Sequence, residues 1–117
     1  MKRLLLIAAL LTCVPGVNAY DARGGATTYA GNNSCGTFLK NVEDSEQMKA
    51  QYLAYIEGYV TAVNMRVKGR TDFFEHTDPE SRYRFVYEYC RKNPLDSVIT
   101  AIFQLALTAG VPLPGKP

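Results

Sequence analysis

The chain has 117 residues, with 13 Lys or Arg, 11 Asp or Glu and a formal net charge of +2. The two basic residues behind this excess, Lys2 and Arg3, lie in an N-terminal targeting segment, so the chain expected after export is neutral. Without a basic excess or a clustered basic face, the sequence argues against nucleic-acid binding.

Residues 1–19 have the pattern of a cleaved signal peptide: a positive start, an apolar run over residues 4–14 and small residues over 17–19. The apolar run has about 11 residues, whereas a membrane span needs roughly 20. We therefore expect a periplasmic or secreted protein with no membrane association after cleavage. A retained anchor and a lipoprotein attached at Cys13 are the alternatives.

Cleavage after Ala19 would remove Cys13 and leave Cys35 and Cys90 as the cysteines of the exported chain. In an oxidising compartment an even number of cysteines indicates disulfide bonding, and two thiols allow only one intramolecular pair. A crosslink between positions about 55 residues apart should stabilise the fold by roughly 4 kcal/mol. That is comparable with the whole folding free energy of a small domain.

The first part of the exported chain, residues 20–33, is rich in Gly, Thr, Ala and Asn and predicts a flexible lead-in. Ser34 is a suitable N-cap for a short helix over residues 35–41, because its hydroxyl can accept a hydrogen bond from the first turn. Phe38 and Leu39 are expected to face the core.

The longest expected helix covers residues 46–67, with Asp44 or Ser45 as its N-cap. Apolar residues recur in it at spacings of three and four, as in an amphipathic helix: Met48, Tyr52, Tyr55, Ile56, Tyr59, Val60, Val63 and Val67. Gly58 interrupts this pattern. Gly in a helix interior lowers stability by roughly 1 kcal/mol relative to Ala. Either another backbone approaches closely at Gly58, or the helix tolerates this loss without a structural reason.

A loop over residues 71–78 should precede the third helix, which Asp78 and Pro79 start, since Pro is tolerated at the first helical position. The inward face is expected to comprise Tyr83, Val86, Tyr87 and Cys90, with Phe85 and Tyr89 on its flank. The basic residues of this helix are assigned to its solvent side: Arg82, Arg84, Arg91 and Lys92.

Asn93 and Pro94 repeat the start signal, and Gly110 stops the fourth helix. Its buried side is expected to comprise Leu95, Val98, Ile99, Ile102, Phe103 and Ala106. Residues 111–117 contain three prolines and predict a non-helical tail.

No stretch alternates apolar and polar residues for long enough to indicate a sheet, and the sequence has no internal repeat. The sequence therefore predicts an all-α fold. We expect a small four-helix, disulfide-stapled domain over residues 34–110, with one short and three longer helices.

The sequence lacks motifs for catalysis or cofactor binding. It has one histidine and no Gly-rich phosphate loop, Cys-x-x-Cys, His-Glu-x-x-His or nucleophile elbow. One dense group of acidic residues and a histidine lacks the spacing of a calcium loop and the nitrogen or sulfur ligands of a zinc site: Asp72, Glu75, His76, Asp78 and Glu80. We interpret it as a solvated, helix-capping loop, and expect no enzyme activity, no cofactor and no metal.

Six of the eight tyrosines fall on the two central helices: Tyr52, Tyr55, Tyr59, Tyr83, Tyr87 and Tyr89. Tyrosine suits both the edge of a small core and a protein interface, and packing at the core edge is the simpler interpretation. Tyr55 and Tyr89, together with Phe85, are the candidates for an exposed interaction surface.

Three motifs resemble those of a known family. Ser-Cys-Gly-Thr-Phe-Leu over residues 34–39 is similar to the opening of the HdeA/HdeB periplasmic acid-stress chaperones, and Tyr-Cys-Arg-Lys-Asn-Pro over residues 89–94 resembles a junction of the HdeB branch. Tyr-Ile-Glu-Gly-Tyr over residues 55–59 resembles the middle helix of the broader group, which includes immunity proteins of type VI secretion systems. The resemblance implies a compact helical fold, a disulfide between Cys35 and Cys90, and a periplasmic location.

The leading hypothesis for function is a small non-enzymatic binding protein that resembles the HdeA/HdeB acid-stress chaperones. Acid would release its apolar faces, and its partners would be unfolded client proteins. The second hypothesis is an inhibitor or immunity protein that binds one toxin or enzyme. A small hydrolase using two acidic residues is the third. Homodimer formation is left open.

Overall fold

The computed structural model describes residues 29–66 and 72–112. The expected signal peptide over residues 1–19, residues 20–28 of the lead-in and most of the Pro-rich tail lie outside the described residues. Within the described residues, no helix combines the length and the apolar character that crossing a membrane requires.

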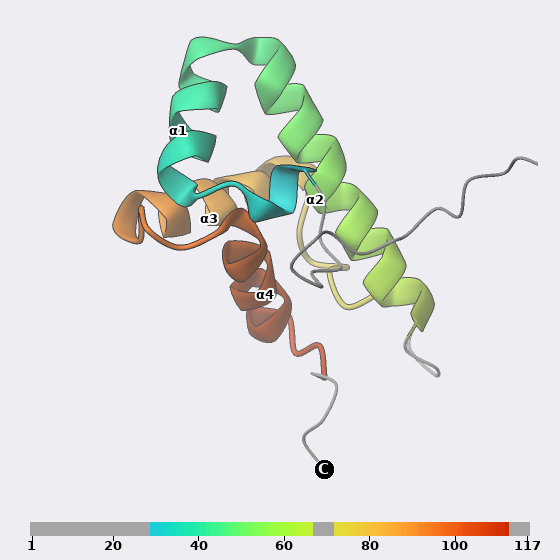
Figure 1. Cartoon of the computed structure of the whole chain (residues 1–117). Coiled ribbons are helices and arrows are strands. Elements are labelled where there is room, and N and C mark those ends of the chain that lie inside the picture. The colour runs from blue at the N-terminus through green and yellow to red at the C-terminus, as the bar shows by residue number, and fades with distance from the viewer. Residues whose placement is uncertain (1–28, 67–71, 113–117) are drawn as a thin grey trace, which may run out of the picture.

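The fold is all-helical, as predicted, and its elements follow one another as η2 (Tyr29–Asn32), α1 (Cys35–Asp44), α2 (Glu46–Arg66), α3 (Pro79–Lys92) and α4 (Val98–Thr108). Helices α1 and α2 form a hairpin, α3 crosses below α1, and α4 runs away from the end of α3 (Figure 1). The short η2 helix packs against α4.

Helices α1 and α4 begin side by side, at a single antiparallel bridge between Ser34 and Ser97. The Cys35 N–H donates to the Asp96 carbonyl at 2.7 Å, and the Val98 N–H donates to the Asn33 carbonyl at 3.0 Å. The first N–H groups of a helix have no acceptor within that helix. Here the carbonyl before α4 accepts from the first N–H of α1, and the carbonyl before α1 accepts from the first N–H of α4.

Side-chain caps complete both starts. Ser34 accepts from the Thr37 N–H, and Ser97 accepts from the Thr100 N–H. The predicted N-cap at Ser34 is confirmed, and the same Ser-x-x-Thr arrangement at Ser97 starts α4.

The other helix ends also follow local sequence signals. Ser45 caps α2 through its hydroxyl, which accepts from the Met48 N–H at 3.2 Å. Asp78 caps α3 and Pro79 takes the first helical position, as predicted. Gly110 has φ +80° after the end of α4, and the next N–H, of Val111, returns to the Ala106 carbonyl at 3.0 Å. This is the Schellman arrangement, which favours glycine.

All four α-helices contribute buried side chains to the core, and the ring of Phe38 on α1 contacts aromatic rings of α2 and α3. The Phe38 ring meets the ring of Tyr52 edge-on, with centroids 4.8 Å apart, and the ring of Tyr83 at 6.1 Å. The Tyr52 hydroxyl is reached by the Asn33 side-chain amide at 2.6 Å, which satisfies the one polar atom of this buried ring. The largest fully buried side chains include Phe38, Tyr52, Phe74, Ile56, Ile102, Val86 and Val98.

Several predicted boundaries are wrong. Helix α1 continues to Asp44 instead of ending near residue 41, and part of the predicted lead-in forms η2, where Ala30 is buried. Helix α4 begins at Val98 instead of Pro94, because residues 93–97 form the turn that bonds to the start of α1.

That later start changes which side chains are buried. Leu95, assigned to the buried side of the fourth helix, is 96% exposed, and Phe103 is 44% exposed. Val98, Ile102 and Ala106 are buried as predicted. Among the long-helix residues, Tyr52, Ile56, Val60 and Val63 are buried, whereas Val67 lies outside the described residues.

Two further assignments need correction. No backbone approaches Gly58, since a Cβ built there meets nothing within 4 Å, so simple tolerance is the right interpretation. Arg82, assigned to the solvent side of α3, is buried at 7% exposure.

Candidate functional site

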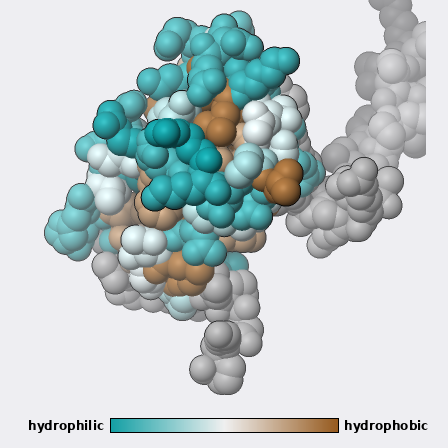
Figure 2. Space-filling model, turned by 90° about the vertical axis from the view of Figure 1, so that its left-hand side faces the viewer, coloured by the Kyte–Doolittle hydropathy of each residue, from teal (hydrophilic) through white to brown (hydrophobic). Residues whose placement is uncertain are grey.

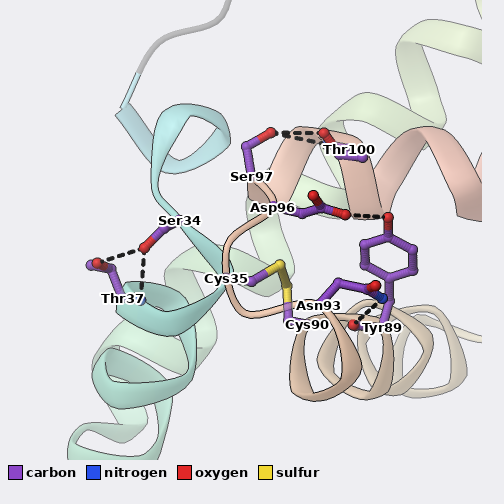
Figure 3. The surroundings of a disulfide bond; sticks show 9 residues. All are labelled: Ser34, Cys35, Thr37, Tyr89, Cys90, Asn93, Asp96, Ser97 and Thr100. Carbon is purple, nitrogen blue, oxygen red and sulfur yellow. Dashed lines mark hydrogen bonds between the residues drawn. A yellow bond between two sulfur atoms is a disulfide. The ribbon is translucent and has the colours of Figure 1, made fainter.

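The disulfide between Cys35 and Cys90 joins the first residue of α1 to the last full turn of α3, with the two Cα atoms 4.7 Å apart. Figure 3 shows the bond between the two sulfur atoms. Both cysteines are fully buried. The predicted pairing is therefore confirmed. Next to the disulfide, the Gly36 N–H donates to the Pro94 carbonyl. The start of α1 is therefore joined to α3 by a covalent bond and to the turn after α3 by a backbone hydrogen bond.

A side-chain hydrogen bond near the disulfide joins the end of α3 to the turn that precedes α4. The Tyr89 hydroxyl donates to the Asp96 carboxylate at 2.6 Å (Figure 3). This bond to a charged acceptor raises the pKa of Tyr89 because it favours the protonated phenol. The Asn93 side chain caps the same turn by donating to the Tyr89 carbonyl at 3.0 Å.

Helices α2 and α3 are joined by a bidentate ion pair between Glu57 and Arg82. The Arg82 Nε donates to one Glu57 oxygen at 2.8 Å, while a terminal guanidinium nitrogen donates to the other. The remaining terminal nitrogen donates to the Thr77 carbonyl and hydroxyl. The hydrogen bonds from Arg82 to Glu57 raise the pKa of Arg82 further above its ordinary value.

A second carboxylate contact joins α1 to α3. The Tyr87 hydroxyl donates to Glu43 at 2.7 Å, and this bond raises the pKa of Tyr87. Glu43, on α1, and Glu57, on α2, thus both accept hydrogen bonds from α3.

The acidic loop before α3 is organised by hydrogen bonds between its own side chains and nearby backbone. Asp72 accepts from the Phe74 N–H and from the Asn64 amide, each at 2.8 Å, and the Asn64 carbonyl oxygen accepts from the Phe73 N–H. In the described part of the chain, no three His, Cys, Asp or Glu side chains gather where they could hold a metal ion. The same described residues leave no buried side-chain nitrogen or oxygen without a partner.

The predicted interaction surface is divided between two helices. Tyr55 lies on α2 beside Ala30 of η2, whereas Phe85 and Tyr89 lie on α3. All three side chains are half-buried and pack against the core. Phe85 lines a hollow with Phe74 and Leu105, and the use of these residues as an interface stays a prediction.

The large apolar side chains that reach solvent are different ones. Among the described residues they are Met65, Leu95, Phe103 and Leu107, at 83%, 96%, 44% and 43% exposure. On the face that Figure 2 presents, hydrophilic side chains separate the apolar ones into small patches.

Phe103 and Leu107 border an apolar groove of about 650 Å³ between α2 and α4. The buried side chains Val63 and Val111 lie at its base, and Tyr59 contacts Phe103 with ring centroids 6.0 Å apart. We call this hollow the α2–α4 groove. A partial signal for it exists in the sequence, because Phe103 and Leu107 are apolar and four residues apart on one helix, but the helical spacing predicts a buried position for Phe103.

Comparisons with known proteins identify no relative: no family model, curated protein or solved structure matches the chain. The resemblance to the HdeA/HdeB group therefore stays a prediction that depends on the cysteine motifs.

Proposed function

We propose that this chain is a small exported, non-enzymatic binding protein that exposes apolar surface in acid, in the manner of the HdeA/HdeB acid-stress chaperones that its cysteine motifs resemble. One observation carries the proposal. Each polar side-chain link from α3 to α1 or α2 in the described residues includes a carboxylate: Tyr87 binds Glu43, Arg82 binds Glu57, and Glu80 pairs with Lys49. The covalent link between Cys35 and Cys90, by contrast, does not depend on pH.

Acid would act on these links directly. Near pH 2 to 3, below the reference carboxyl pKa values of about 4, the carboxylates of a protein are largely protonated. Glu57 would then leave the buried Arg82 cation without its counter-charge, and a charge buried without a partner is strongly destabilising. The basic residues would at the same time lose the acids that balance them, and the resulting repulsion favours a looser chain.

The start of α3 should loosen in the same pH range. The backbone N–H and the hydroxyl of Ser81 lower the pKa of Asp78 below its ordinary value. A lowered folded-state pKa gives stability that is present above the unfolded value and lost as the pH falls through the folded value. Acidification therefore removes the N-cap of α3 together with its side-chain links to α1 and α2.

The surface released by these changes is the apolar core face of α3 and its neighbours. It includes Tyr83, Val86, Phe38 and Ile56, all buried at neutral pH. The disulfide would keep the loosened helices α1 and α3 together, so that the exposed surface stays part of a compact chain.

The direct test is suppression of aggregation of an unrelated protein at pH 2 to 3 by the oxidised chain. A Glu43→Gln/Glu57→Gln variant should begin to suppress aggregation at a higher pH than the wild type, because amides replace both carboxylates. A Glu75→Gln/Glu88→Gln variant makes the same charge change at positions that pair only with the nearby residues His76 and Arg91 and do not join α3 to another helix, so it should behave as the wild type. An intact fold at pH 2 with no suppression would contradict the proposal.

A second candidate function is an inhibitor or immunity protein that binds one partner at neutral pH. The hollow beside Phe85, about 350 Å³ and lined also by Phe74 and Leu105, favours it because an apolar side chain of a partner could enter there. Purification of the exported chain from periplasm should then recover one stoichiometric partner, and Phe85→Asp should abolish that recovery. If no stoichiometric partner is recovered, this second candidate is discarded.

A further inference from the structure

The α2–α4 groove has the features of a small-molecule site. Its volume of about 650 Å³ falls within the roughly 300–1,000 Å³ of typical ligand pockets. Its lining is mainly apolar, with Val63 and Val111 buried at the base and Phe103 and Leu107 at the rim. An apolar hollow of this size between two helices suits a hydrocarbon chain.

One positive charge lies at this groove. Among the described residues, Arg66, the last residue of α2, is the only charged side chain that lines the groove, and it has no ion-pair partner there. Tyr59, on the same helix, also lines this groove. Burial raises the pKa of Tyr59, and the positive charge of Arg66 partly opposes that rise. The lining of this mainly apolar groove thus includes one cation and one phenol.

We propose that the α2–α4 groove binds a single-chain carboxylate amphiphile, with its hydrocarbon tail against Phe103 and Leu107 and its carboxylate at Arg66. The guanidinium donates two parallel N–H groups, which match the two oxygens of a carboxylate. The tail would cover apolar side chains that are otherwise in contact with water at neutral pH.

Binding at this groove does not depend on the acid response proposed above. The amphiphile would bind the intact fold at pH 7, where α2 and α4 are in place, whereas suppression of aggregation is measured at pH 2 to 3. Either result can fail without the other.

The experiment is calorimetric titration of the oxidised chain at pH 7 with octanoate, decanoate, dodecanoate and tetradecanoate, each below its micellar concentration. We expect one site per chain and an affinity that rises with length by up to about fourfold per added methylene, the value for complete burial of a CH₂ group. Dodecyltrimethylammonium has the same tail with the opposite charge, and it should bind at least about tenfold more weakly than dodecanoate because Arg66 repels it.

Three variants locate the site. Arg66→Gln should lower the affinity for dodecanoate about tenfold, the loss expected for one charge-assisted contact, and should remove the preference over the ammonium analogue. Leu107→Gln should also weaken binding. Leu95→Gln changes another exposed leucine outside the groove and should leave binding unchanged. Circular dichroism at pH 7 checks that each variant is folded.

The proposal is overturned by an affinity that does not depend on chain length, by equal binding of carboxylate and ammonium, or by equal losses in Leu107→Gln and Leu95→Gln. Sedimentation of the ligand-free chain tests another occupant. A dimer that dissociates in Leu107→Gln but not in Leu95→Gln would show that a second copy covers the groove, and would also overturn the proposal.

Discussion

Gly58 and Gly110 illustrate how the same residue type can have opposite roles in one chain. Gly58 lies inside α2, has ordinary helical geometry, and leaves open space where a side chain would be. Gly110 follows α4 with φ +80°, a conformation that L-residues with a side chain rarely adopt. The first glycine weakens a helix that would tolerate alanine, and the second makes the end of a helix possible.

Substitution of each glycine by alanine should therefore have opposite effects. Gly58→Ala should raise the free energy of unfolding by about 0.5–1 kcal/mol, because alanine reduces the entropy of the unfolded chain and clashes with nothing. Gly110→Ala should lower it by about 1 kcal/mol, because alanine is strained at positive φ. Urea unfolding at pH 7 measures both, and destabilisation by Gly58→Ala would contradict the open space seen at this position.

Tyr83 gives the fold a dependence on alkaline pH. Burial of its ring raises the pKa of the phenol to about 12, with further increases from Tyr87 and the nearby carboxylates Glu80, Glu46 and Glu43. In the unfolded chain the phenol ionises near pH 10. Between pH 10 and 12 the folded state therefore holds the proton more tightly, and stability falls as the pH rises through this range.

The measurement is the free energy of unfolding between pH 8 and 12 for the wild type and for Tyr83→Phe. The variant lacks the ionisable group, so its stability should fall less steeply above pH 10. In an ultraviolet titration of the phenols, the Tyr83→Phe variant should lack the ionisation step that the wild type shows near pH 12. Identical profiles for the two proteins would show that Tyr83 does not titrate abnormally.

At the scale of the helices, the fold depends on how each helix starts and on which polar groups join it to the next. The starts of α1 and α4 exchange backbone hydrogen bonds across the bridge of Ser34 and Ser97, so neither helix start is independent of the other. The joint between α2 and α3 instead depends on the ion pair of Glu57 and Arg82.

Glu57→Gln should cost about 2 kcal/mol, because Arg82 keeps its charge in a buried position and loses the carboxylate. Glu88→Gln is the matched control: Glu88 forms a pair with Arg91 on the exposed side of α3, and its removal should change stability by less than about 0.5 kcal/mol. Thermal unfolding at pH 7 distinguishes the two. Equal effects would show that burial of the Arg82 pair contributes nothing.

The parts of the fold that could be predicted from the sequence are those encoded locally. Ser34, Asp78, Pro79 and Gly110 act on their own helix within a few residues, and the helix ends that they predict are correct. The amphipathic spacing likewise located the buried residues of α2, and the predicted removal of Cys13 leaves one possible cysteine pair, which the structure contains.

The errors arise where a distant part of the chain decides the outcome. Arg82 is buried because Glu57, 25 residues earlier, lies on a facing helix, and no local pattern records that partner. Leu95 is exposed because the turn before α4 bonds to the start of α1 instead of continuing as a helix. The α2–α4 groove could not be predicted for the same reason, since the spacing within a helix does not say where a neighbouring helix will be absent.

At the scale of the whole molecule, the disulfide is the link that acid cannot remove. It joins α1 to α3 across a sequence separation of 55 residues, and it lies in the core with both cysteines fully buried. The carboxylate links from α3 to α1 and α2 and the N-cap of α3 are, by contrast, all sensitive to pH. The oxidised chain therefore combines one permanent link with several that depend on ionised carboxylates.

Reduction of the disulfide should lower the free energy of unfolding by roughly 4 kcal/mol, because the unfolded chain regains the entropy of an open loop. Urea unfolding at pH 7 with and without a reducing agent measures this difference. A chain whose stability does not change on reduction would contradict the assigned role of the crosslink.

The most direct test of the acid response is a pH titration of the oxidised chain from pH 7 to 2, followed by near-ultraviolet and far-ultraviolet circular dichroism and by binding of an apolar dye. Between about pH 4 and 2, where carboxylates protonate, we expect loss of the near-ultraviolet signal, a rise in dye binding and retention of much of the helical signal. An unchanged near-ultraviolet signal at pH 2 with no dye binding would contradict the account.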